Sequence, residues 1–238
     1  MKVKRFIFIS IFALLLCLAN KVNAGELELN KLTYDVQLNS DGSADITETW
    51  NIYIEDTNTL FKTFNIDKSK YKEITDISVK ELRNGVEIPF RETYAEMYHV
   101  SKGCFYALVN KNKKFEIAWG VQIENETRTY QIKYKVVEAV KQYNDCSEFY
   151  WQFVATDSEI PARKVIGTIT LPTTVSSSEQ FRVWAHGPLN GNIEKISDDT
   201  VKFEVTNFRA RTMLEARVVV PKEIFIENQN VEPINKLN

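Results

Sequence analysis

The chain has 238 residues, of which 44% are hydrophobic and 26% are charged. This apolar content is enough for a folded core and excludes an intrinsically disordered chain. The formal net charge is −2, and the first 24 residues carry four positive charges and no acid, so the remaining 214 residues carry a net charge near −6. Such a chain is not a nucleic-acid binder by electrostatics. With three cysteines and two histidines, we expect neither a metal site nor a cofactor.

The N-terminus has the three parts of a secretory signal peptide. Basic residues between Lys2 and Arg5 precede an apolar run, Phe6–Ala19, and a small residue, Ala24, stands at the expected cleavage position. The apolar run has 14 residues, whereas a membrane-spanning helix needs about 20. We therefore predict a signal-peptide helix over residues 1–24 and an extracytoplasmic mature chain that starts near Gly25; an uncleaved anchor is the alternative.

The C-terminal end is polar. No second apolar run long enough to span a membrane occurs before Asn238, and residues 227–238 are predicted to form a polar linker or tail. Membrane association would then depend on a segment beyond Asn238 or on a membrane partner.

Alternation of apolar and polar residues is the strongest pattern in the chain. Two alternating runs, 32–38 and 44–54, flank a turn at residues 40–43 and predict an antiparallel hairpin. Asn84-Gly85 predicts another tight hairpin turn. Further runs with one wet and one dry face cover residues 115–119, 130–136, 181–185, 201–205 and 214–220. The pattern predicts an all-β fold, an antiparallel β-sandwich.

The domain organisation has two readings. Residues 25–226 form either one continuous β-rich ectodomain or two packed sandwich subdomains, 25–156 and 157–226, divided near Thr156-Asp157-Ser158. A short helix is expected within the stretch from Ala139 to Phe149.

Two cysteines remain after the predicted cleavage, Cys104 and Cys146. In an oxidising compartment we expect them to form a disulfide. Two separate thiols are the alternative, because the sequence cannot test the geometry that a disulfide requires.

Glu48 interrupts the apolar side of its strand, where it stands between Ile46 and Trp50. A buried carboxylate needs a cationic or hydrogen-bonding partner. The favoured interpretation is a structural ion pair or a bulge that turns the side chain outward; a tuned acid in a cleft is the alternative.

Three aromatic positions are candidates for ligand contacts. Trp151 lies in a dense aromatic strand and is expected to fill the core rather than to form an exposed platform. Trp184 and His186 have the opposite parity from their apolar neighbours and are weak candidates for an exposed binding patch.

Several segments of the chain resemble DUF2207, a family of bacterial envelope proteins. The matching segments are strand patterns and turns: 34–36, 41–43, 46–49, 129–136, 148–151, Pro161, 168–172, 186–187 and 217–221. The resemblance implies an extracytoplasmic β-rich domain that follows a signal peptide. Family members usually continue into transmembrane helices and a cytoplasmic tail, whereas this sequence ends at Asn238.

The resemblance also implies a partner for Glu48. The family tends to carry an arginine soon after the second strand, and this chain has Phe61-Lys62-Thr63 in that region. If the family arginine pairs with the glutamate, Lys62 replaces it here.

Three functions remain compatible with the sequence. No serine-hydrolase, zinc-protease, P-loop or dinucleotide motif is present. We therefore expect a non-enzymatic envelope domain that binds an envelope protein or a glycan. An envelope hydrolase acting on glycan or peptide through carboxylates is the second hypothesis, and a passive structural spacer is the third.

Overall fold

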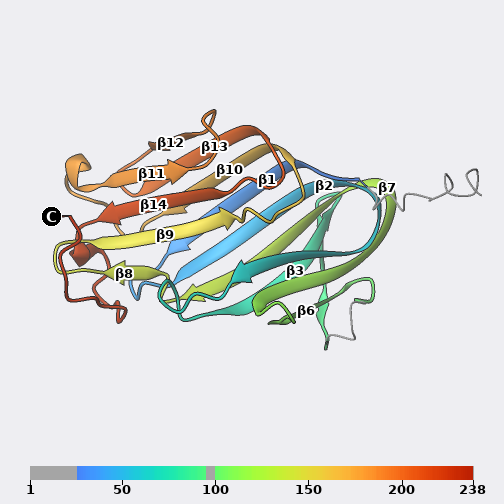
Figure 1. Ribbon diagram of the computed structural model, residues 1–238, viewed down its shortest axis with the longest axis horizontal. Helices are drawn as coiled ribbons and strands as arrows, with labels where there is room; N and C mark the ends of the chain where they lie inside the picture. Colours follow the sequence, from blue (N-terminus) through green and yellow to red (C-terminus); the bar gives the residue numbers. More distant parts are fainter. Residues whose placement is uncertain (1–25, 95–99, 238) are drawn as a thin grey trace, which may run out of the picture.

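The computed structural model describes residues 26–94 and 100–237, so the predicted signal peptide lies outside the described residues. Within those ranges the chain forms fourteen β-strands and no α-helix, in two layers (Figure 1). No helix of this part of the chain is long and apolar enough to cross a membrane.

The larger layer is a mixed sheet of ten strands. Eight follow the order β12-β13-β10-β1-β2-β7-β3-β4, while β6 pairs with β7 and β5 pairs with β6. The strands are β1 (Leu27–Leu38), β2 (Ala44–Asn65), β3 (Glu73–Arg83), β4 (Val86–Pro89), β5 (Arg91–Glu92), β6 (Cys104–Val109), β7 (Lys114–Val137), β10 (Ala162–Thr170), β12 (Asn192–Lys195) and β13 (Thr200–Phe208). The predicted turn at Asn84-Gly85 joins β3 to β4, with φ values of 51° and 79° at its two residues.

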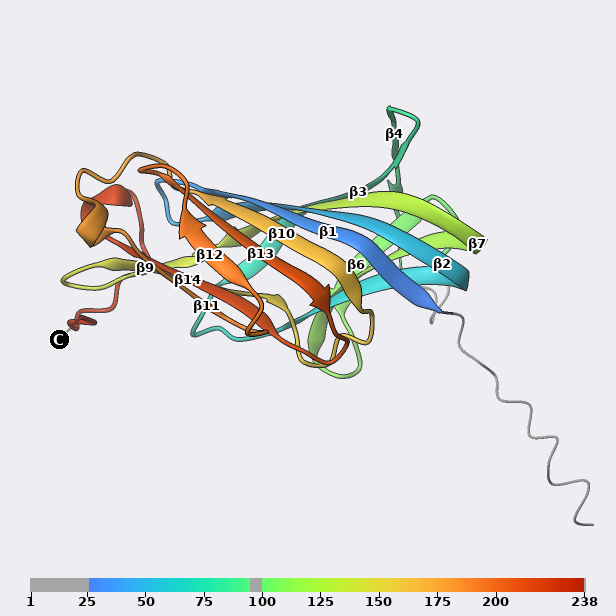
Figure 2. The same cartoon turned by 90° about the horizontal axis from the view of Figure 1, so that it is seen from above.

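The smaller sheet has four antiparallel strands in the order β11-β14-β9-β8. They are β8 (Val140–Gln142), β9 (Ser147–Val154), β11 (Arg182–His186) and β14 (Leu214–Val220). This sheet faces the larger one (Figure 2). One cluster of buried apolar side chains is shared by both sheets.

Two expectations about strands are wrong. The fold is not purely antiparallel, because β1 pairs in parallel with β10 and β5 pairs in parallel with β6. Period-two alternation identifies a strand but does not fix its direction. The short helix expected between Ala139 and Phe149 is instead the β8–β9 hairpin, in which Val140 pairs with Phe149.

The loop near Thr156 does not separate two sheets. β1 and β2 come from before it, β10 and β13 from after it, and all four are neighbours in the larger sheet. The smaller sheet also contains strands from both sides of the loop, since β9 precedes the loop and β14 follows it.

β2 and β7 are long paired strands that bend sharply near their middles. Glu48 and Lys62 lie 14 residues apart on β2, a span of roughly 46 Å in a straight strand. Their side chains are nevertheless in contact, at 2.5 Å. A bulge between Thr57 and Thr59 marks the bend, and Gln122 and Asn125 of β7 have positive φ close to it. The second half of β2, residues 57–65, still pairs with β7 and returns across the core, opposite the first half of the strand (Figure 1).

The C-terminal segment, predicted as a polar linker or tail, lies against the fold over residues 227–237. The backbone of Gln142 donates to Asn230 O and accepts from the backbone of Glu232, so the segment runs along the outer edge of β8. Lys236 forms an ion pair with Glu148 at 3.4 Å. The polar groups of this segment therefore bond to the edge of the smaller sheet.

Asn228 anchors this segment, and its replacement by alanine should be destabilising. Its side chain is buried; Nδ2 donates to Val140 O at 3.1 Å and Oδ1 accepts from the backbone of Asn230 at 2.9 Å. Loss of these bonds should lower the free energy of unfolding by about 1–3 kcal/mol. Urea unfolding measures the change, and Gln229→Ala, at an exposed neighbour, is the matched control. Equal effects of the two variants would contradict the anchoring role.

Candidate functional site

Glu48 is completely buried between the two layers, and both of its oxygens are hydrogen-bonded. Oε1 accepts from Tyr134 Oη at 2.6 Å and contacts Lys62 Nζ at 2.5 Å, while Oε2 accepts from Trp50 Nε1 at 3.1 Å. Burial, and then the adjacent Glu48 charge, hold the pKa of Tyr134 well above its ordinary value. Glu48 is therefore a fully satisfied member of a buried network.

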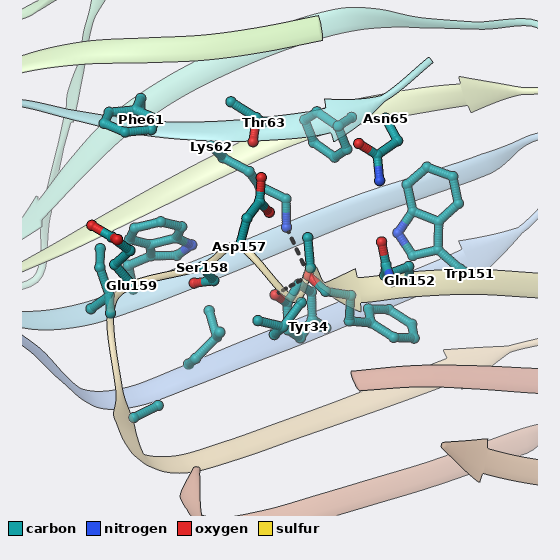
Figure 3. A pocket seen from close by; sticks show the side chains of 18 of the residues that line it. Tyr34, Phe61, Lys62, Thr63, Asn65, Trp151, Gln152, Asp157, Ser158 and Glu159 are labelled. Atoms are coloured by element: carbon teal, nitrogen blue, oxygen red, sulfur yellow. Dashed lines mark hydrogen bonds between the residues drawn. The ribbon is translucent and has the colours of Figure 1, made fainter. Parts of the chain in front are cut away.

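Lys62 reaches Glu48 from the returning half of β2. Its Nζ also donates to Phe153 O at 3.1 Å and lies 5.2 Å from the ring centres of Tyr34 and Phe64. An ammonium group has three N–H donors, and these contacts occupy two of them. Lys62 extends from its strand toward Tyr34, beside the cavity described next (Figure 3).

A cavity of about 470 Å³ lies between the returning half of β2 and β9, and we name it the slot. Its floor comes from the first half of β2 and from β1, including Leu29, Tyr34 and Trp50. One side is formed by residues 59–65 and the other by residues 150–160. The volume lies within the range of roughly 300–1,000 Å³ that is usual for ligand sites, and the floor is mostly apolar.

Acidic residues predominate among the charged side chains that line the slot. They are Asp67, Asp157 and Glu159, against the two cations Lys62 and Lys70. Asp157 forms an ion pair with Lys114, and Glu159 forms one with Arg211 at 2.9 Å. The Lys62 charge is matched by Glu48, so the slot offers no excess positive charge to an anionic ligand.

Comparison with known sequences decides the family. Residues 28–220 match the N-terminal domain described as predicted membrane protein (DUF2207). The chain belongs to the DUF2207 family. No curated protein matched this DUF2207 chain in a separate comparison.

Solved structures resemble the DUF2207 domain only distantly. A candidate protease from Parabacteroides distasonis is 12% identical, with a TM-score of 0.47 over 81% of this chain and 40% of its own. Yeast LTA4 hydrolase, solved with bestatin, is 9% identical, with a TM-score of 0.47 over 81% of this chain and 28% of its own. A candidate nutrient-binding protein from Legionella pneumophila is 9% identical, with a TM-score of 0.46 over 81% and 67%. The DUF2207 chain thus spans less than half of the first two proteins, and these likenesses assign it no function.

Trp184 and His186 lie together on the edge strand β11 of the DUF2207 domain. Trp184 is 39% exposed, and the Arg217 guanidinium lies 5.1 Å from its ring centre. The His186 and Tyr150 ring centres are 6.3 Å apart. Tyr150 Oη donates to Glu215 at 2.5 Å, and this hydrogen bond, with burial, raises the Tyr150 pKa to about 12. This patch is exposed, but its side chains are engaged with one another.

The expected disulfide is wrong, because Cys104 and Cys146 are both free and buried. Cys104 lies on β6 and packs with Val100 and Tyr106, whereas Cys146 lies in the β8–β9 turn against Val219. The two thiols therefore belong to separate apolar clusters in different sheets, a separation that the sequence does not reveal.

Alkylation without reductant should modify both of these cysteines in the unfolded protein. Burial and the neighbouring Asp145 raise the Cys146 pKa to about 11. Because the thiolate is the reactive form, Cys146 of the folded protein should react slowly at neutral pH. Iodoacetamide labelling followed by mass spectrometry measures both reactions. A disulfide would instead give a linked pair of peptides that weighs two hydrogens less than the two free peptides together and does not react with iodoacetamide. That result would contradict the free-thiol state.

Sequence reasoning missed most of the slot. It singled out Glu48, Lys62 and Trp151, which the structure brings to one region, but not Tyr34 or the loop after β9. One signal was available: Asp56-Thr57-Asn58-Thr59 is a polar, turn-like break in the middle of a long apolar alternation. That break lies at the bend that carries Lys62 back toward Glu48.

Proposed function

We propose that this DUF2207 domain is a non-enzymatic, extracytoplasmic binding module of two packed β layers, and that its slot holds part of a partner. The observation that carries the proposal is the 470 Å³ cavity between the returning half of β2 and β9, with its apolar floor. The family description as the N-terminal domain of a predicted membrane protein supports an envelope location.

The carboxylates around the slot favour binding over hydrolysis. Both oxygens of Glu48 accept hydrogen bonds within the core, and Asp157 and Glu159 each form an ion pair with a basic residue. A glycoside hydrolase needs two carboxyl groups that face one substrate bond, one of them protonated and the other free to act as base or nucleophile. The pairing of these side chains with cations and donors does not provide that arrangement.

The apolar dye N-phenyl-1-naphthylamine tests the slot directly. The dye should bind with increased fluorescence, and Ala155→Trp should weaken its binding roughly tenfold or more, because the indole would fill the slot. Ala185→Trp, at an exposed position on β11, is the matched control and should bind the dye as the wild type does. Circular dichroism and thermal melting establish that both variants are folded.

Two results would contradict the binding function. Equal dye affinity in the wild type and Ala155→Trp would place the dye elsewhere. The absence of dye binding by the folded wild-type protein would favour the passive spacer.

A further inference from the structure

Two strand edges face the slot without a neighbouring strand in the described structure. Residues 150–154 of β9 pair with β14 on one side, and β8 covers only Ser147 to Phe149 on the other. Residues 57–65 of β2 pair with β7 on one side only. Phe153 O accepts from two side chains instead of from a strand: Tyr34 Oη at 2.8 Å and Lys62 Nζ at 3.1 Å.

The spacing of the two edges leaves room between them. Their Cα atoms stay mostly more than 8 Å apart, whereas paired strands lie about 4.8 Å apart. Consecutive residues of both strands line the slot, 59–65 and 150–155, although successive side chains of a strand point to opposite faces. A cavity touches consecutive residues in this way when it runs alongside the strand edge.

We propose that the slot accepts an extended peptide segment of a partner protein, which pairs as a β-strand with β9 and with residues 57–65 of β2. This inference rests on the proposed binding function and specifies its ligand. Strand addition at a free sheet edge is an established mode of peptide recognition, in which backbone hydrogen bonds provide affinity. The inserted strand would join β9 of the smaller sheet to residues 57–65 of β2.

The chemistry of the slot specifies the segment further. Alternate side chains of the bound segment would face the floor formed by Leu29, Tyr34 and Trp50, so we expect those side chains of the segment to be apolar. The third N–H of Lys62 can donate to a peptide carbonyl. A carboxylate there would share one ammonium with Glu48 and leave a net negative charge buried, which is costly. Asp157 and Glu159 are paired with Lys114 and Arg211, so the slot holds no excess positive charge that would favour an acidic segment.

A displayed library of random decapeptides tests the inference on the intact protein. Phage are selected on the wild type after removal of those that bind the folded Ala155→Trp protein. Enriched peptides should have apolar residues at alternate positions and few acidic residues. Methylating the backbone nitrogens of either alternate set should weaken binding roughly tenfold or more, because one set would pair with β9 and the other with residues 57–65 of β2.

Three outcomes would overturn the inference. One is the absence of slot-dependent peptides, and another is enrichment of acidic peptides. The third is an unchanged peptide affinity after N-methylation of either alternate set, which would mean that the slot recognises only the apolar side chains of the peptide. If the dye still binds in an Ala155-dependent manner, each outcome removes strand addition while the binding function stands. Loss of dye binding would remove both.

Discussion

Replacing Glu48 with alanine should lower the free energy of unfolding by about 3–5 kcal/mol. The variant would leave the Lys62 ammonium buried without its counter-ion, and Tyr134 Oη and Trp50 Nε1 without their acceptor. Both effects are desolvation penalties, which exceed the net contribution of an intact hydrogen bond. Thermal and urea unfolding, with the wild type in the same buffer, measure the change.

A double-mutant cycle separates the ion pair from the rest of the network. Glu48→Gln alone leaves the Lys62 charge buried and Lys62→Met alone leaves the carboxylate buried, so each should destabilise the protein. The variant that combines them removes both charges and should recover much of the loss. Additive effects of the two single variants would show that the residues are not coupled. An unchanged melting temperature for Glu48→Ala together with abolished ligand binding would show that the carboxylate serves binding and not stability.

Replacing Gly167 with alanine should be the second large effect, a loss of up to about 3 kcal/mol from overpacking. Gly167 lies on β10 opposite Phe203 of β13, and a Cβ atom at this position would overlap the Cζ end of the Phe203 ring. The ring cannot retreat freely, because its centre lies 4.7 Å from that of Phe153 and 6.4 Å from that of Tyr34. Tyr34 and Phe153 both line the slot, and Tyr34 Oη donates a hydrogen bond to Phe153 O.

Phe203→Leu supplies the control for Gly167→Ala. The smaller side chain vacates the space above the glycine, so the double variant should be less destabilised than the sum of the two single variants. Urea unfolding of all four proteins measures this coupling. A strictly additive cycle would show that the Phe203 ring is not what excludes a side chain at position 167.

Local patterns predicted which segments are strands and where side chains face the core. The parity argument put Glu48 on the dry side of its strand, and the side chain is fully buried. The Asn84-Gly85 turn could be predicted because Asn and Gly tolerate the two positive φ values that this turn type requires, and both residues have positive φ in the structure. Each of these inferences depends only on residues within a few positions of one another.

The remaining features depend on contacts between distant segments. The parallel pairing of β1 with β10 joins segments more than a hundred residues apart, and period-two alternation fits either direction. The placement of Cys104 and Cys146 in different sheets and the docking of residues 227–237 on β8 have the same origin. The slot is also tertiary, because it exists only where the returning half of β2 faces β9.

The four tryptophans of the chain allow the binding site to be tested in one measurement. Trp50 and Trp151 line the slot, whereas Trp184 lies on the exposed patch with His186. We would titrate N-phenyl-1-naphthylamine into uniformly ¹⁵N-labelled protein and follow the four indole N–H signals. Binding in the slot predicts that the Trp50 and Trp151 signals shift while that of Trp184 does not. A shift of the Trp184 signal alone would place the site on the outer patch and contradict the slot.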